Sequence, residues 1–275
     1  MLYNYKDILD LAEKGKFAIP AFNVYNIEEV IGVMNAAKET GAPVIFQIYN
    51  RLFDSGLGRF LAPAILEAIK SLKSPAALHL DHGAGLPQVL RAIRYGATGV
   101  MIDASEFDFK ENSEITKRIV NIAKEVGVDV EGELGHVGTT KDEKQSDYTD
   151  VDEAVQFVDE TGVDALAIMV GTAHGHYKKA PVLAIDRIAE IHGKTKAHLV
   201  LHGGSGVPDE QIKAAVNAGI RKVNFATDVN CTYLAGFRKV DCDTMPLDIM
   251  LSYPSNDVKQ FAIEKIKLLG ADKYV

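Results

Sequence analysis

The sequence predicts a single (β/α)8 barrel that spans residues 1–275. Short runs rich in Val, Ile, Ala and Leu recur along the chain, and segments with helical periodicity separate them. About eight such strand–helix units in roughly 250 residues is the usual size of a (β/α)8 barrel. An open, doubly wound sheet is the alternative, but no Gly-x-Gly-x-x-Gly motif follows the first apolar run.

Each expected strand is a continuous apolar run, as in a parallel sheet that is buried on both faces. The runs are 16–22 (KFAIPAF), 43–48 (PVIFQI), 75–80 (PAALHL), 98–103 (TGVMID), 128–134 (VDVEGEL), 163–170 (VDALAIMV), 197–202 (AHLVLH) and 221–226 (RKVNFA). Helices are expected between them, for example over 27–40, 86–96 and 114–127, where apolar residues recur at helical spacing. Two weakly patterned stretches predict a mobile loop at about 135–150 and a variable, loop-like segment at about 239–257.

Composition excludes several classes of protein. The formal net charge is −8 and no Lys/Arg cluster reaches five residues, so we expect neither a nucleic-acid nor a membrane partner. No apolar run approaches the ~18 residues of a membrane span, and the charged N-terminus lacks the apolar core of a signal peptide. Only two cysteines are present, which is typical of a reducing compartment. The sequence therefore predicts a cytoplasmic protein.

Charged or metal-binding side chains follow almost every expected strand, at the end where such barrels carry their active sites. They are Asn23, Asn50, Arg51, Asp81, His82, Asp103, Ser105, Glu133, His174, His202, Asn224, Thr227 and Asp228.

Three histidines follow the third, sixth and seventh expected strands, and Gly comes directly after each. Because His82, His174 and His202 occupy matching positions, they predict a catalytic zinc site with one coordination position open. The alternative is that each is a hydrogen-bonded core residue, which is less expected for three equivalent positions. His79 lies earlier on its strand and is expected to be a buried structural residue.

Asp81 directly precedes the first of these histidines. At a bent strand end, with Gly83 and Gly85 behind it, its carboxylate could exchange a proton beside the metal. The alternative is an N-cap for the helix expected to start near Leu86.

Two glycine-rich corners, 171–178 (GTAHGHYK) and 202–208 (HGGSGVP), are typical of an anion site. They offer backbone N–H groups, the Ser205 hydroxyl and Lys178, and Asn224 and Thr227 follow the last expected strand. Barrels of this class commonly bind phosphate near their last two strands.

The chain resembles the class II, zinc-dependent ketose-bisphosphate aldolases of the fructose- and tagatose-1,6-bisphosphate type. The resemblance extends from AIPAFN (18–23) to NFATD (224–228) and rests on the motifs HLDH, MIDAS, EGELG, GTAHG and LHGGSG. It implies that His82, His174 and His202 hold zinc and that Asp81 exchanges a proton with the C4 hydroxyl of the ketose. It implies that Asp103 and Glu133 lie near the metal, where a second metal or a monovalent cation could bind.

The resemblance also implies a site for dihydroxyacetone phosphate, with Asn23 as a further candidate on the first strand. The matching positions are Gly175, Lys178, Gly203, Ser205, Asn224 and Thr227. The partner is then a small sugar phosphate, and the family implies a homo-oligomer, either a dimer or a tetramer.

Several positions depart from the family. Where a neighbouring subunit supplies an arginine for the second phosphate, this chain has Leu247. We expect Arg51 to meet an anionic or polar group at the far end of a non-standard ketose phosphate, unless it is a surface residue paired with Asp54. Position 226 is Ala, as in many tagatose-cleaving members.

The family's GGxED loop, whose glutamate moves the proton at C3, reads GTTKDEK here, with Lys141 near the glutamate's place. Asp142 or Glu143 is the nearest candidate for that role.

The sequence thus predicts a zinc aldolase, a carbon–carbon lyase that forms dihydroxyacetone phosphate and an aldehyde. The alternatives are an ordinary tagatose- or fructose-1,6-bisphosphate aldolase and a non-catalytic sugar-phosphate-binding relative. A metal-dependent barrel hydrolase is disfavoured because the first strand ends in AFNVYN and carries no His-x-His pair.

Overall fold

The computed structural model describes residues 1–140, 148–175, 177, 179–241 and 243–274. Eight parallel strands form a closed barrel in chain order, and β8 pairs with β1. The strands are β1 Ile19–Asn23, β2 Val44–Tyr49, β3 Ala76–Gly83, β4 Gly99–Ile102, β5 Asp129–Leu134, β6 Ala165–Ile168, β7 His198–Leu201 and β8 Ile220–Phe225. The (β/α)8 prediction is confirmed, and the closed barrel excludes the open sheet.

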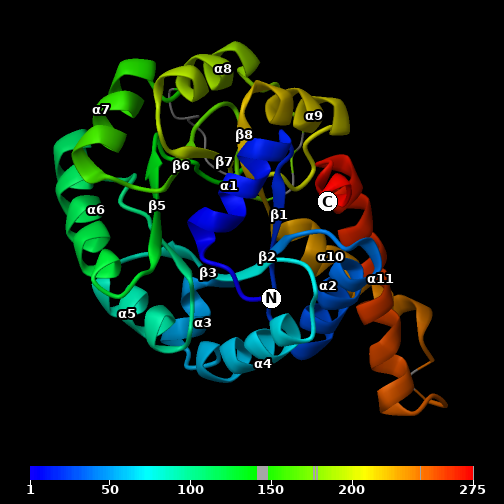
Figure 1. Ribbon diagram of the computed structural model, residues 1–275. Coiled ribbons are helices and arrows are strands. Elements are labelled where there is room, and N and C mark those ends of the chain that lie inside the picture. The colour runs from blue at the N-terminus through cyan, green and yellow to red at the C-terminus, as the bar shows by residue number, and fades with distance from the viewer. Residues whose placement is uncertain (141–147, 176, 178, 242, 275) are drawn as a thin grey trace.

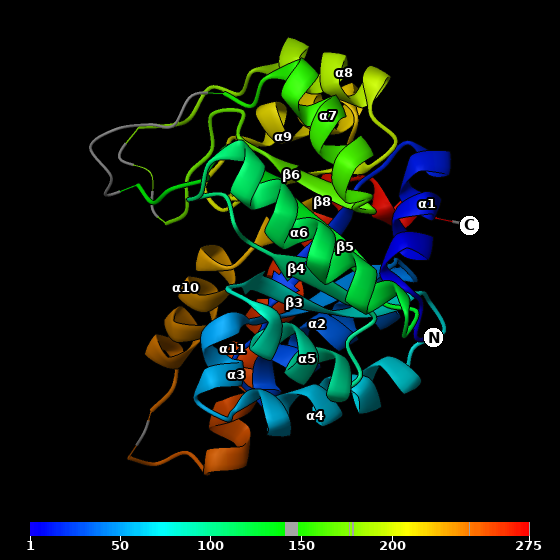
Figure 2. The same ribbon diagram turned by 90° about the vertical axis from the view of Figure 1, so that its left-hand side faces the viewer.

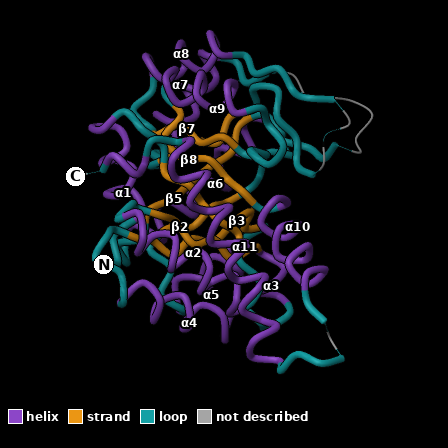
Figure 3. Tube along the Cα trace, turned by 90° about the vertical axis from the view of Figure 1, so that its right-hand side faces the viewer, coloured by secondary structure: helices purple, strands orange, loops and turns teal. Residues whose placement is uncertain are grey.

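Helices surround the barrel, as Figure 3 shows with the strands at the centre. They are α1 Tyr5–Gly15, α2 Ile27–Thr40, α3 Asn50–Asp54, α4 Gly58–Lys70, α5 Leu86–Arg94, α6 Phe109–Lys124, α7 Val151–Thr161, α8 Ile185–Lys194, α9 Asp209–Ala218, α10 Thr227–Gly236 and α11 Leu247–Leu268, with the 3-10 turns η1 Phe237–Lys239 and η2 Ala271–Lys273. The strands are almost wholly buried because these helices cover their outer face. Side-chain caps at Asn26, Asp108 and Asp150 set where α2, α6 and α7 begin.

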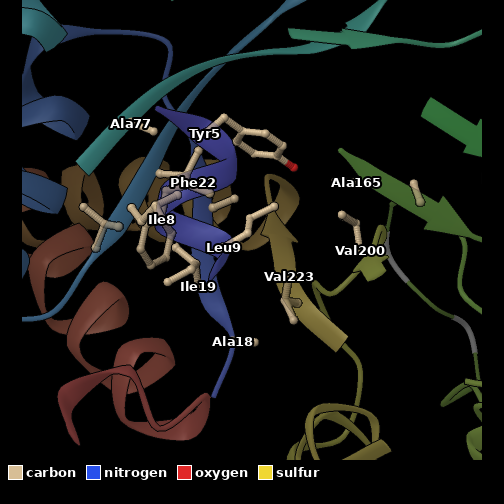
Figure 4. Close-up of a cluster of buried hydrophobic side chains, with 14 of the residues drawn as sticks. Tyr5, Ile8, Leu9, Ala18, Ile19, Phe22, Ala77, Ala165, Val200 and Val223 are labelled. Carbon is tan, nitrogen blue, oxygen red and sulfur yellow. The ribbon is translucent and has the colours of Figure 1, made fainter. Parts of the chain in front are cut away.

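The first helix closes the N-terminal opening of the barrel. Figure 1 looks along the barrel with α1 across its centre, and α1 contacts β1, β3, β5, β7 and β8. Ile8 and Leu9 are fully buried there. In the close-up of Figure 4, Tyr5 points its hydroxyl away from α1, toward the side of the barrel where Ala165 and Val200 lie. The C-terminal opening is left for the site.

The segment over 239–257 is the expected loop only in part, because α11 begins at Leu247 and continues through Pro254, whereas 240–241 and 243–246 lie outside helices and strands. The sequence did not predict the start of this helix because its apolar residues do not form a buried stripe. Leu247 and Ile249 are both exposed. Ser255 donates a hydrogen bond to the Glu28 carbonyl, 2.9 Å away, which ties α11 to α2. Figure 2 shows the first turns of α11 below α10, at the lower end of the molecule. Of the other expected loop, residues 141–147 lie outside the described residues.

Within the described part of the chain, no helix is both long and apolar enough to cross a membrane.

A matched pair of helical glycines tests the packing of α2 on α11. A Cβ at Gly32 would lie 2.7 Å from the Ser255 carbonyl oxygen and 2.9 Å from the Val258 Cβ, whereas a Cβ at Gly193 in α8 would meet nothing within 4 Å. We expect Gly32→Ala to lower the free energy of unfolding by about 1–3 kcal/mol through overpacking. Gly193→Ala should raise it by about 0.5–1 kcal/mol through helix propensity. Denaturant titration of both variants checks this, and equal effects would contradict the described helix contact.

Candidate metal and substrate site

The three histidines meet at the C-terminal end of the barrel. His82 is the second-last residue of β3, His202 directly follows β7, and His174 lies in the segment after β6. Their ring centroids are 4.7 to 5.9 Å apart, and one nitrogen of each ring lies within 4.8 Å of the others. This spacing is compatible with three imidazoles around one ion.

Each of these histidines is oriented by an acceptor on one ring nitrogen. The bonds run from His82 Nδ1 to Asp103 Oδ2 at 2.7 Å, from His174 Nδ1 to the Val137 carbonyl at 2.9 Å, and from His202 Nε2 to Glu131 Oε1 at 2.8 Å. Because carboxylates and carbonyls only accept, each ring carries a proton on this nitrogen, and binding of a metal would require the second nitrogen to be unprotonated.

Two buried polar atoms at this point face each other without a well-oriented hydrogen bond. His202 Nδ1 and Glu133 Oε2 lie 3.0 Å apart, and both side chains are fully buried. Although burial lowers the pKa of His202, the Glu131 and Glu133 carboxylates raise it to about 10. A cation near both atoms would satisfy them, so the residues fit the expected zinc. A second set of donor atoms within 4.8 Å, from His82, Asp103 and Glu133, could hold another ion.

A bend at the end of β3 brings two consecutive side chains toward the site. The register of β3 against β4 shifts between Leu80 and Gly83, and His82 has a φ of 49°, which is rare outside glycine. A side chain at Gly83 would collide with the Met101 carbonyl, since its Cβ would lie 2.4 Å away. Asp81 and His82 therefore both line the same cavity.

Asp81 is a buried carboxylate held by side-chain amides. It accepts hydrogen bonds from Asn23 Nδ2 at 2.6 Å, Gln47 Nε2 at 3.0 Å and Asn224 Nδ2 at 3.2 Å. Burial alone would raise the pKa of Asp81, but the nearby His82 and His202 hold it below its usual value. The alternative N-cap role is wrong, because α5 begins at Leu86 behind Gly85 with no side-chain cap. Asp81 is available as a proton acceptor.

A small cavity of about 30 Å³ adjoins Asp81 on the side of β7 and β8. It is lined by Asn23, Asp81, His174, Gly175, Gly203, Ser205, Asn224, Ala226 and Thr227. The two glycine-rich corners pack backbone to backbone here, because a Cβ at Gly203 would lie 2.5 Å from the Ala173 carbonyl oxygen. The Tyr177 hydroxyl joins them, accepting from the Ala173 amide at 2.8 Å and lying 3.0 Å from the Gly203 carbonyl. The N-terminus of α10 opens at Thr227, which favours an anion in this cavity.

A larger cavity of about 680 Å³ adjoins His82 and His174. Its lining includes Tyr25, Tyr49, Asn50, Arg51, Glu106, Phe107 and His136. The Arg51 guanidinium lies over the Tyr49 ring, 4.7 Å from its centroid. Arg51 is exposed, as the alternative expects, but its pairing with Asp54 is wrong, because that carboxylate instead binds Arg91 at 2.9 Å and Gln88 at 2.6 Å.

Three candidate residues, Asp142, Glu143 and Lys178, lie outside the described residues. Residues 138–140, which precede Asp142 and Glu143, pair with His174: the His174 amide donates to the Gly138 carbonyl, and the Thr140 amide donates to the His174 carbonyl.

Several residues that support the site were missed by sequence reasoning. Glu131 and Lys222 lie in mid-strand and Tyr5 lies on α1, yet all three meet inside the barrel. The i, i+2 spacing of Glu131 and Glu133 on one strand was the available signal. His136 also lines the larger cavity.

A closed parallel barrel with a histidine cluster at its C-terminal end, beside a small polar cavity, is compatible with a metal-binding barrel protein. A sequence model described as fructose-bisphosphate aldolase class-II matches residues 3–273. The chain belongs to this family of class II aldolases.

Relatives and solved structures agree with this assignment. The sulfofructosephosphate aldolase of Alkalicoccus urumqiensis is 36% identical over 268 residues, which cover 95% of this chain and 93% of the relative. The uncharacterized protein YdjI of Escherichia coli K12 is 35% identical over 260 residues, 93% of each chain. The crystal structure of the YdjI aldolase superposes with a TM-score of 0.91 at 32% identity and full coverage of both chains. A putative fructose-1,6-bisphosphate aldolase from Coccidioides immitis, at 24% identity and 99% coverage of both chains, shares the fold with a TM-score of 0.90.

Proposed function

We propose that this chain is a zinc-dependent aldolase that reversibly cleaves a ketose phosphate into dihydroxyacetone phosphate and an aldehyde. One observation carries the proposal: three convergent imidazoles, a buried carboxylate at Asp81 and an anion-sized cavity adjoin one another at a single barrel end. Family membership supports it.

The buried carboxylate handles the proton of the bond-breaking step. Asp81 takes the proton from the C4 hydroxyl during cleavage and returns it during synthesis, and its three amide donors fix the direction of its oxygens. His82, His174 and His202 would hold zinc, which when bound would supply a Lewis acid for the negative charge on the substrate oxygens, so no Schiff-base lysine would be required. Asp142 or Glu143 is proposed to move the proton at C3.

The small cavity receives the phosphate of dihydroxyacetone phosphate. Backbone groups at Gly175 and Gly203, the Ser205 hydroxyl, and the Asn224 and Thr227 side chains supply its polar lining. Lys178 is proposed to add a positive charge.

The far end of the substrate lies in the larger cavity, where Arg51 supplies a positive charge. Arg51 rests on Tyr49, and the carboxylate of Asp54 pairs with other residues, so the guanidinium can receive an anionic substrate group. The name of one relative, sulfofructosephosphate aldolase, supports a ketose phosphate with a second anionic group that is not a phosphate. Leu247 in place of the family's cross-subunit arginine agrees with such a substrate.

The conservative alternative is a tagatose- or fructose-1,6-bisphosphate aldolase. Ala226, which lines both cavities, favours the tagatose type within that alternative.

Cleavage of a panel of ketose 1-phosphates and 1,6-bisphosphates by the zinc-loaded protein tests the proposal. We expect the highest kcat/KM for a ketose 1-phosphate whose far end carries a sulfonate or carboxylate. His174→Ala, which removes one metal ligand, should be inactive across the panel. Release of dihydroxyacetone phosphate is the measurement. A 1,6-bisphosphate as the best substrate would favour the conservative alternative, and no cleavage at all would favour the sugar-phosphate-binding protein.

Arg51→Ala tests recognition of the far end. Loss of a charge-assisted contact should raise KM for the anionic-ended substrate by roughly ten- to a hundredfold, with a much smaller change for a neutral-ended ketose 1-phosphate. Arg59→Ala is the matched control, because Arg59 also lies over an aromatic ring, that of Phe60, but does not line the cavity. Equal KM values for the wild type and Arg51→Ala would reject this role.

We also propose a homo-oligomer, a dimer or tetramer. Leu234, Leu247, Ile249 and Tyr253 expose apolar side chains along α10 and the start of α11, which is typical of an association surface. Light scattering on the purified chain should report at least twice the monomer mass, and a monomer would contradict the proposal.

A further inference from the structure

The fully buried carboxylate of Glu131 lies next to the proposed metal site, on the side toward the N-terminal end of the barrel. Glu131 accepts from His202 Nε2 at 2.8 Å, and neither side chain has any exposure. This bond fixes the His202 ring with Nδ1 toward Glu133 and the proposed zinc.

A lysine and a tyrosine hold the same carboxylate from below. Lys222 of β8 donates to Glu131 Oε2 at 2.8 Å, and both side chains are fully buried. The Tyr5 hydroxyl, from α1, donates to the same oxygen. A buried carboxylate is costly without compensation, so the lysine charge allows Glu131 to stay ionised beneath His202.

A second branch connects this network to Asp81. The Tyr5 ring stacks on His79 with 4.5 Å between centroids, and His79 Nδ1 lies 3.3 Å from Gln47 Nε2. The same Gln47 amide donates to Asp81 at 3.0 Å. Burial lowers the pKa of His79 to about 3, so its ring is neutral and can accept from Gln47.

We propose that Tyr5, Glu131 and Lys222 are positioning residues of the metal site, and that α1 acts on zinc affinity through the Tyr5 hydroxyl. The inference rests on the zinc site of the proposed function. If so, α1 helps to position the metal ligands, although it lies at the opposite end of the barrel from the substrate cavities.

A purely structural role predicts a different outcome. If these residues only filled the barrel, substituting them would lower the free energy of unfolding and leave the zinc affinity of the folded protein unchanged. Zinc affinity, measured on folded and metal-stripped protein without substrate, therefore separates the two roles.

Two variants avoid leaving a buried charge unpaired. Tyr5→Phe keeps the ring on His79 and removes only the hydroxyl. Glu131→Gln combined with Lys222→Met removes both charges together while keeping similar side-chain lengths. Tyr3→Phe, in the same N-terminal segment, is the matched control for loss of a tyrosine hydroxyl.

The measurements are zinc dissociation constants by chelator competition and the visible absorption spectrum of the cobalt-substituted proteins. We expect roughly ten- to a hundredfold weaker zinc binding in the double variant. We expect roughly three- to tenfold weaker binding in Tyr5→Phe, an altered cobalt spectrum in both, and no change in Tyr3→Phe.

Wild-type zinc affinity and spectrum in both variants would overturn the inference and leave the proposed function standing. A loss confined to the double variant would overturn the part assigned to α1. Wild-type protein that binds no zinc would contradict the proposed function as well.

Discussion

The buried carboxylates inside the barrel determine which side chains can surround them. Asp81, Glu131 and Glu133 are at most 4% exposed, and a buried charge requires partners in direct contact. Amides surround the first, and a lysine, a tyrosine and a histidine surround the second. Glu133 binds Ser105 and the Val137 amide through one oxygen and leaves the other beside the unpartnered nitrogen of His202. A cation between Glu133 and His202 would satisfy both atoms, and nitrogens of His82 and His174 lie close to the same point.

The two cavities beside the histidine cluster are built differently. The small cavity is built from backbone turns that tolerate no added side chain at Gly203, so its shape is set by the barrel itself. The larger cavity is lined by side chains from the segments that follow β2, β4 and β5. Under the proposed function, substitutions there would change the aldehyde without moving the proposed metal and phosphate sites, because active-site loops of a barrel vary independently of its strands.

Much of this could be predicted from the sequence. The apolar runs indicated all eight strands, and His82, His174, His202 and Asp81 were recognisable because each follows such a run. The residues inside the barrel could not be predicted in this way. Glu131 and Lys222 lie in strands that are not neighbours, and their side chains meet only when the barrel closes. The left-handed backbone at His82 likewise depends on the shift of β3 against β4, which no local pattern records.

The most direct test of an aldolase centre needs only dihydroxyacetone phosphate and does not depend on the identity of the aldehyde. Incubation of the zinc-loaded protein with this compound in D2O, followed by proton magnetic resonance, reports whether a C3 proton exchanges with solvent. We expect zinc-dependent exchange of one of the two C3 protons, because an aldolase site must stabilise the carbanion formed when the C–C bond breaks. Binding of dihydroxyacetone phosphate without exchange would contradict it and identify a sugar-phosphate-binding protein.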